Sequence, residues 1–119
     1  MEWTEVLKNL KNRLQCTSTE LAHIFEVSVP VMTSWIKGFD SKGNIVSPTY
    51  AYAAIIRQTT KINDAELKNA FNLALKRPRM NAVKTSNEQF KVSTRNISYQ
   101  DLANNEPSAL QVFMKNIYN

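Results

Sequence analysis

Two serines stand where short helices are expected to begin, and each brings a hydroxyl group that can contact a phosphate. Ser18 follows Thr17, and Ser28 follows Val27. The first turn of a helix has unpaired N–H groups and the positive end of the helix dipole, so a serine there can hold an anion. The same serine can instead only cap the backbone of its own helix. Both interpretations stay open for Ser18 and for Ser28.

Basic side chains are the second source of binding chemistry. The 119 residues carry a net charge of +5, and residues 76–95 hold six basic residues and one acid, while the rest of the chain holds nine of each. This polar segment follows a helix that is expected to end before Pro78, which favours a linker or an arm. Arg77 and Arg79 at its start are candidates for phosphate contacts, because neutralised phosphates release counterions. The alternative is a linker that its charge keeps solvated.

A pair of short helices must position the two serines. Thr17 and Glu20 have the spacing of a capping box, which predicts a helix from about Ser18. Its buried face carries the apolar residues Leu21, Ile24 and Phe25. A second helix is predicted from the Ser28 cap to about Lys37, with Pro30 tolerated in its first turn and Gly38 at its end.

The remaining periodicity predicts three more helices around this pair. They span about residues 4–14, 47–58 and 63–76, and the composition, with only two glycines and four prolines, favours an all-α chain. Residues 39–47 form a long loop with Lys42 near its tip. This loop either contacts a sugar–phosphate backbone or is a tolerated surface insertion.

The two-helix motif resembles the Cro-and-repressor type of helix-turn-helix, which has the lambda-repressor-like fold. The resemblance covers about residues 6–60 and rests on Thr17, Glu20, Leu21, Ala22, Val27, Ser28, Met32, Trp35 and Gly38. It implies a five-helix bundle and a sequence-specific regulator that binds double-stranded DNA, such as a dimeric repressor of a phage or mobile element. Glu26 departs from the glycine that is usual in the turn, and a left-handed non-glycine residue costs about 1 kcal/mol. Ser18 replaces a glutamine that often holds a phosphate in the family.

The resemblance also implies which residues meet the bases, because the second helix of this motif enters the major groove with its first turns. The matching positions are Val29, Pro30, Thr33 and Ser34, with Lys37 further along beside the backbone. The first two offer apolar contact only, and the two hydroxyls make single hydrogen bonds. Much of the specificity is therefore expected from DNA shape, from half-site spacing in a dimer, or from Arg77 and Arg79 in a minor groove.

The sequence divides into a DNA-binding domain (1–76), a basic linker or arm (77–97) and a C-terminal helical segment (98–119). Helical spacing in the last part covers 98–104 and 107–118. The final helix carries an apolar stripe of Leu110, Phe113, Met114 and Ile117. So short a helix needs a surface to pack on, either its own bundle or a second subunit. A two-fold operator favours the homodimer.

Catalysis has little support in the sequence. His23 is the only histidine and lacks partners at ligand spacing, so we expect a surface residue; Cys16 has no disulfide partner, so we expect a small, partly buried side chain. Phosphate-binding glycine loops and nucleophile elbows are absent from the sequence. We therefore expect a non-enzyme without metal or cofactor.

No apolar run approaches the roughly 20 residues that span a bilayer, and the first residues mix acids with bases, so we expect no membrane partner and a cytoplasmic location. The alternative function is an antitoxin-like module that uses the same fold as a scaffold and binds another protein through its C-terminal segment. RNA binding through the arm is disfavoured, because Phe90 is its only stacking aromatic.

Overall fold

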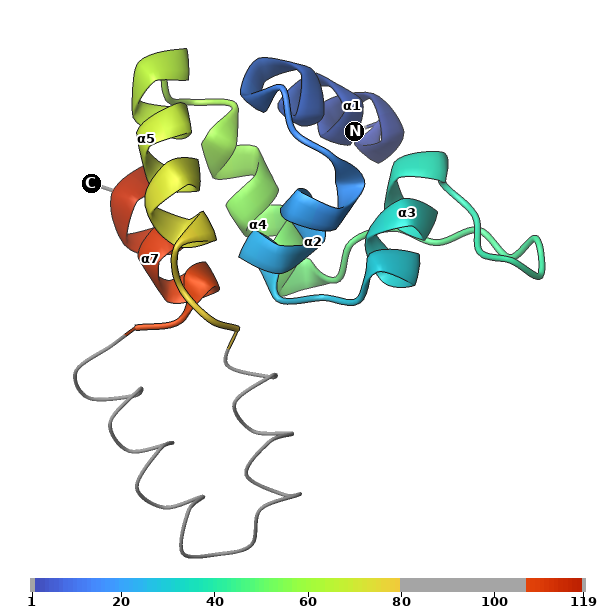
Figure 1. The fold of residues 1–119 in the computed structure, drawn as a ribbon. Helices are drawn as coiled ribbons and strands as arrows, with labels where there is room; N and C mark the ends of the chain where they lie inside the picture. The colour runs from blue at the N-terminus through green and yellow to red at the C-terminus, as the bar shows by residue number, and fades with distance from the viewer. Residues whose placement is uncertain (1, 80–106, 119) are drawn as a thin grey trace, which may run out of the picture.

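The computed structural model describes residues 2–79 and 107–118, and its regular elements there are all helices (Figure 1). The helices are α1 (Trp3–Leu14), α2 (Ser18–Phe25), α3 (Val29–Lys37), α4 (Tyr50–Thr59), α5 (Asp64–Leu75) and α7 (Ala109–Ile117). The predicted all-α class is confirmed for these residues. The predicted arm from residue 80 to 97 and the helix predicted over 98–104 lie outside them. Within the described ranges, no helix has the length and apolar character needed to cross a membrane.

Side-chain caps explain where α2 and α3 begin. The Thr17 hydroxyl accepts a hydrogen bond from the N–H of Glu20, whose carboxylate accepts one from the N–H of Thr17, so the predicted capping box is formed. The Ser28 hydroxyl accepts the N–H of Val31 at 3.2 Å and caps α3. The starts of both helices are therefore as the sequence predicts.

Two other helix starts differ from the prediction. α4 begins at Tyr50 and not near Ser47, because the chain is still extended at Thr49 (φ −67°, ψ 166°). α7 begins at Ala109 and not at residue 107, because Ser108 forms a capping box with Gln111. In each case the helix starts directly after a residue with an extended backbone, which is Thr49 before α4 and Ser108 before α7.

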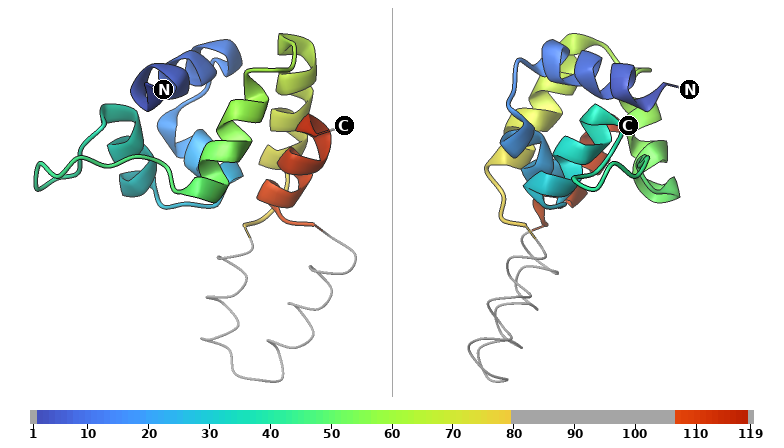
Figure 2. Two further views of the ribbon diagram at one scale, coloured as in Figure 1. Left: turned by 180° about the vertical axis from the view of Figure 1, so that it is seen from behind. Right: turned by 90° about the vertical axis from the view of Figure 1, so that its right-hand side faces the viewer.

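The helices are arranged with α5 and α7 side by side at one end of the molecule and α3 at the other, with α2 packed between them (Figures 1 and 2). The Arg13 guanidinium joins α1 to the end of α4 and the start of α5. Its Nε donates to Asp64 at 2.7 Å, and its two terminal nitrogens donate to the carbonyl oxygens of Thr59 and Ile62. One side chain thus satisfies the end of α4 and holds the start of α5.

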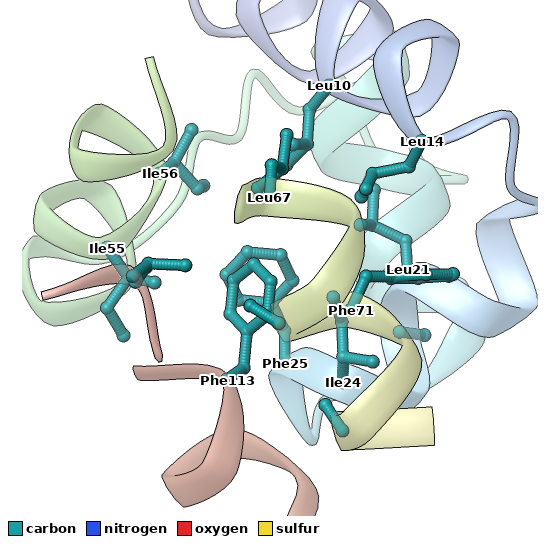
Figure 3. Close-up of a cluster of buried hydrophobic side chains, with 14 of the residues drawn as sticks. Leu10, Leu14, Leu21, Ile24, Phe25, Ile55, Ile56, Leu67, Phe71 and Phe113 are labelled. Atoms are coloured by element: carbon teal, nitrogen blue, oxygen red, sulfur yellow. The ribbon is translucent and has the colours of Figure 1, made fainter. Parts of the chain in front are cut away.

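A series of four aromatic rings runs through the core from α7 to α3. The ring centroid of Phe113 lies 5.6 Å from that of Phe25, which lies 6.4 Å from that of Tyr52. The Tyr52 ring lies 5.3 Å from that of Trp35 on α3. These pairs are edge-on or tilted, which is the preferred packing of aromatic quadrupoles. Figure 3 shows the two phenylalanine rings surrounded by aliphatic side chains of α1, α4 and α5.

The final helix packs on its own chain, and this corrects the predicted use of its apolar stripe. Phe113 and Ile117 are fully buried in the core, and Leu110 and Met114 are half-buried. Two of the four residues that were predicted to pair subunits are therefore occupied by contacts inside the chain. Ala109, Phe113 and Ile117 of α7 belong to the same buried cluster as the core residues of α1–α5.

We expect Phe113→Ala to lower the free energy of unfolding by about 3–5 kcal/mol, because it empties a fully buried site beside Phe25. Lys115→Ala, an exposed change on the same helix, is expected to alter it by less than about 0.5 kcal/mol. Urea unfolding at two protein concentrations measures both. A Phe113→Ala effect that appears only at the higher concentration would contradict intramolecular packing and assign the ring to an association surface.

Candidate nucleic-acid interface

α3 is held by one face and presents the other to solvent. Met32 is fully buried, and Trp35 is buried against Tyr52. The residues on the opposite face are the predicted contact residues Val29, Pro30, Thr33, Ser34 and Lys37. The two hydroxyl residues are half-buried and the other three are exposed.

These five residues line a single open groove. Its volume is about 430 Å³, and Phe39, Asp40 and Ser41 of the following loop form its other wall. The groove offers the hydroxyls of Thr33, Ser34 and Ser41, several apolar surfaces, one ammonium group and the Asp40 carboxylate, which the loop's own N–H groups bind. Such a surface makes single hydrogen bonds and apolar contacts, and it lacks the bidentate donors that read guanine or adenine.

The start of α3 suits an anion. Its first turn carries no acid, so the positive end of its dipole has no side-chain compensation there. Ser28 is a cap that accepts the N–H of Val31, and this bond does not use its hydroxyl proton. The capping and phosphate-binding roles of Ser28 are therefore compatible.

A lysine side chain that the sequence did not indicate contacts the start of α2. The Nζ atom of Lys11 donates to the Ser18 hydroxyl at 3.1 Å. The Glu20 carboxylate occupies the same end, where it binds the N–H of Thr17 at 2.9 Å, and its charge opposes a second anion. Ser18 is thus already an acceptor for Lys11. The only signal in the sequence is a basic residue in the last turn of the preceding helix.

Arg77 lies at the C-terminal end of α5, and the structure does not bring it to the α3 groove. Its Nε atom donates to the carbonyl oxygen of Pro107 at 2.9 Å. Its own carbonyl oxygen lies 2.8 Å from Nε2 of His23, which is half-buried and not the surface residue predicted. Arg77 therefore helps to join α2, α5 and the segment that leads into α7. At the start of the predicted linker or arm, this side chain is therefore engaged within the chain.

Arg79 is also half-buried beside the core. Burial raises the pKa of the Tyr52 hydroxyl and the charge of Glu26 raises it further, while the Arg79 guanidinium acts in the opposite direction. The three groups are therefore close enough to interact. Arg79 is not among the residues that line the α3 groove.

Lys42 occupies the predicted position near the tip of the loop after α3. The loop is folded as a hairpin, and the N–H of Lys42 donates to an Asp40 carboxylate oxygen at 2.9 Å. Its side chain is exposed. Of the predicted backbone-contacting lysines, Lys37 lines the groove and Lys42 follows Ser41 at its border.

The turn between α2 and α3 is closed by Glu26, which has a left-handed backbone (φ 57°, ψ 43°). Its side chain is only 6% exposed, and Oε2 accepts the N–H of Leu110 at 2.9 Å. Leu110 lies in the first turn of α7, where the helix dipole favours a negative charge. The residue that departs from the family pattern therefore makes a bond to α7 that glycine cannot make.

Other chemistry is not assembled in the described residues. They contain no group of three or more His, Cys, Asp or Glu side chains that could hold a metal ion. Burial, and next the charge of Glu20, raises the pKa of the Cys16 thiol to about 11. The thiol is therefore protonated at neutral pH, which makes it a poor nucleophile.

Comparisons with family models, with curated proteins and with solved structures find no match for this chain. The resemblance to the Cro-and-repressor type therefore stands on the residues of the α2–α3 pair alone.

Replacing Glu26 separates backbone strain from the bond to α7. Glu26→Ala is expected to lower the free energy of unfolding by about 2–3 kcal/mol, because it leaves the N–H of Leu110 without this acceptor. Glu26→Gly is expected to cost about 1 kcal/mol less, because glycine relieves the left-handed strain. Thermal and urea unfolding of the full chain measure both variants.

Gln15 supplies the matched control, since it is also left-handed (φ 52°) but exposed. Gln15→Gly is expected to stabilise the chain by up to about 1 kcal/mol. A Glu26→Gly variant that gains stability as Gln15→Gly does would show that the carboxylate bond to α7 contributes nothing.

Proposed function

We propose that this chain is a sequence-specific regulator that binds double-stranded DNA through α3. In this proposal α2 and α3 form a helix-turn-helix of the Cro-and-repressor type, as the sequence resemblance implies. The regulator acts as a repressor of the kind that phages and mobile elements use, without catalysis or a cofactor.

The observation that supports this proposal most strongly is the shared groove on α3. Residues that were selected from the resemblance alone, Thr33 and Ser34 among them, line one open surface, while the opposite face of the helix is buried. The helix begins with a cap and an uncompensated dipole, and it ends near the cation of Lys37. These are the features that a helix needs to enter a groove between two phosphate chains.

Each group then has a distinct task at the DNA. Val29 and Pro30 pack on thymine methyl groups, and the hydroxyls of Thr33 and Ser34 donate to or accept from single base-edge atoms. Ser28 and Lys37 bind phosphates and so fix the register without reading sequence. Because single hydrogen bonds discriminate weakly, shape and half-site spacing carry much of the specificity.

The proposed regulator is a homodimer on a two-fold operator, as half-site recognition by this motif requires. The dimer contact cannot consist of Phe113 and Ile117, because both are buried inside one chain. The same burial means that the alternative function, an antitoxin-like module, would have to bind its partner through other residues of the C-terminal segment.

Selection from a randomised duplex pool tests the proposed function directly. The purified full chain is mixed with the pool at near-physiological salt, and the retained duplexes are sequenced. Two inverted half-sites about one helical turn apart are expected. Retention without a motif, or no retention, would refute sequence-specific DNA binding.

Substitutions on α3 separate base reading from phosphate binding. Thr33→Ala and Ser34→Ala are expected to change the retained motif at one position each. Lys37→Ala is expected to weaken all duplexes alike and to reduce the slope of log K against log salt by about 0.9. Lys68→Ala, an exposed lysine on α5, is the matched control and should change neither quantity. Equal losses for the two lysines would assign the binding to net charge and not to α3.

A further inference from the structure

The segment that follows α3 is a closed hairpin. Phe39 and Ile45 form an antiparallel bridge, and the N–H of Asp40 donates to the carbonyl oxygen of Asn44 at 2.9 Å. One carboxylate oxygen of Asp40 accepts the N–H groups of Lys42 and Asn44, both at 2.9 Å, and the other accepts the Asn44 side-chain amide. These bonds keep the pKa of the Asp40 carboxyl below its usual value. The hairpin is thus ordered by its own hydrogen bonds, and Val46, which follows it, packs against the core.

The hairpin presents apolar side chains that bury little surface within the described residues. Ile45 is 92% exposed and Phe39 is 51% exposed. A loop that served only as a tolerated insertion would normally carry polar residues here, since an exposed isoleucine gains nothing from folding. The side chains therefore suit contact with another molecule.

The hairpin also forms one surface with α3. Asp40 and Ser41 border the groove that Thr33, Ser34 and Lys37 line, and they border a second groove of about 380 Å³ beside Pro30 and Val31. Figure 1 and the left-hand view of Figure 2 show the hairpin projecting away from the bundle next to α3. A molecule that α3 contacts therefore lies within reach of the hairpin.

We propose that residues 39–45 are a second DNA-contacting element, an inference that rests on the proposed function of α3. When α3 lies in the major groove, the hairpin at its C-terminal end reaches the flanking backbone and the edge of the adjacent minor groove. There Ile45 and Phe39 pack on the carbon atoms of the sugars, and Lys42 binds a phosphate. Aliphatic and aromatic side chains are the ones that proteins use for apolar contact in a minor groove.

The charges near the hairpin favour DNA over a protein as the partner. Lys37 stands before it and Lys42 at its tip, whereas its one acid, Asp40, is engaged in hydrogen bonds of the hairpin itself. The exposed side of this element therefore combines cations with apolar surface. That combination fits a sugar–phosphate strand, whose charge lies on the phosphates and whose sugars are apolar.

The test measures affinity, salt dependence and footprint on a duplex that the wild-type chain selects. Ile45→Ala is expected to weaken binding roughly five- to thirty-fold with an unchanged salt slope, because one buried aliphatic side chain is lost. Lys42→Ala is expected to reduce the slope by about 0.9. Leu73→Ala, which changes a 38% exposed leucine on α5, is the matched control and should alter neither. Hydroxyl-radical footprinting should show flanking sugars that the wild type protects and Ile45→Ala exposes.

The outcomes separate this inference from the proposed function. A wild-type chain that selects no duplex refutes the proposed function and the hairpin contact together. If the wild type binds and Thr33→Ala changes the motif, but Ile45→Ala keeps wild-type affinity and footprint, the hairpin contact is refuted and the function of α3 stands. That result would assign the exposed isoleucine to a protein surface. Ile45 makes no core contact, so unchanged unfolding temperatures of the variants exclude misfolding as the cause.

Discussion

The bond from the N–H of Leu110 to the Glu26 carboxylate joins parts of the chain that are 84 residues apart, and the placement of α3 depends on it. Glu26 ends α2 in a left-handed conformation, so its backbone fixes the direction in which the chain enters α3. Its side chain meanwhile caps α7. A second connection between α7 and α3 is the series of packed aromatic rings Phe113, Phe25, Tyr52 and Trp35. Backbone strain at one turn is thus offset by packing that spans the core.

A consequence is that the α2–α3 pair is not an independent unit in this chain. The N–H of Ala109 donates to the carbonyl oxygen of Pro78 at 3.0 Å, and Arg77 binds the carbonyl oxygen of Pro107. The residues that follow α5 therefore lie beside those that lead into α7. Within the described residues, Lys37 lines the groove of α3 and Lys42 follows Ser41 at its border.

Local signals made much of the fold predictable. The Thr17 and Glu20 capping box, the Ser28 cap, Gly38 at the end of α3 and the Asn63 cap of α5 all act within a few residues, so the sequence alone indicates them. The stripe on α7 was also recognised, but a stripe states only that a face is buried and not against what. The sequence therefore left both a second subunit and its own bundle open for Phe113 and Ile117, and the structure packs them in the bundle. Lys11 beside Ser18, and Arg77 beside Pro107, depend on tertiary contacts that no spacing reveals.

The chemistry of α3 and the geometry of the hairpin explain each other. Thr33 and Ser34 form only single hydrogen bonds, so a helix of this composition would bind and discriminate weakly by itself. In the proposed DNA complex, the hairpin next to α3 would add contact area at little entropic cost, because the Asp40 bonds already order it in the free chain. The position of the hairpin depends on Gly38, whose left-handed backbone (φ 92°) ends α3. A Cβ atom at this position would lie 3.0 Å from the Thr4 side chain of α1. The chain turns outward from the bundle at this glycine. The same residue that stops the helix therefore sets the hairpin at the edge of its groove.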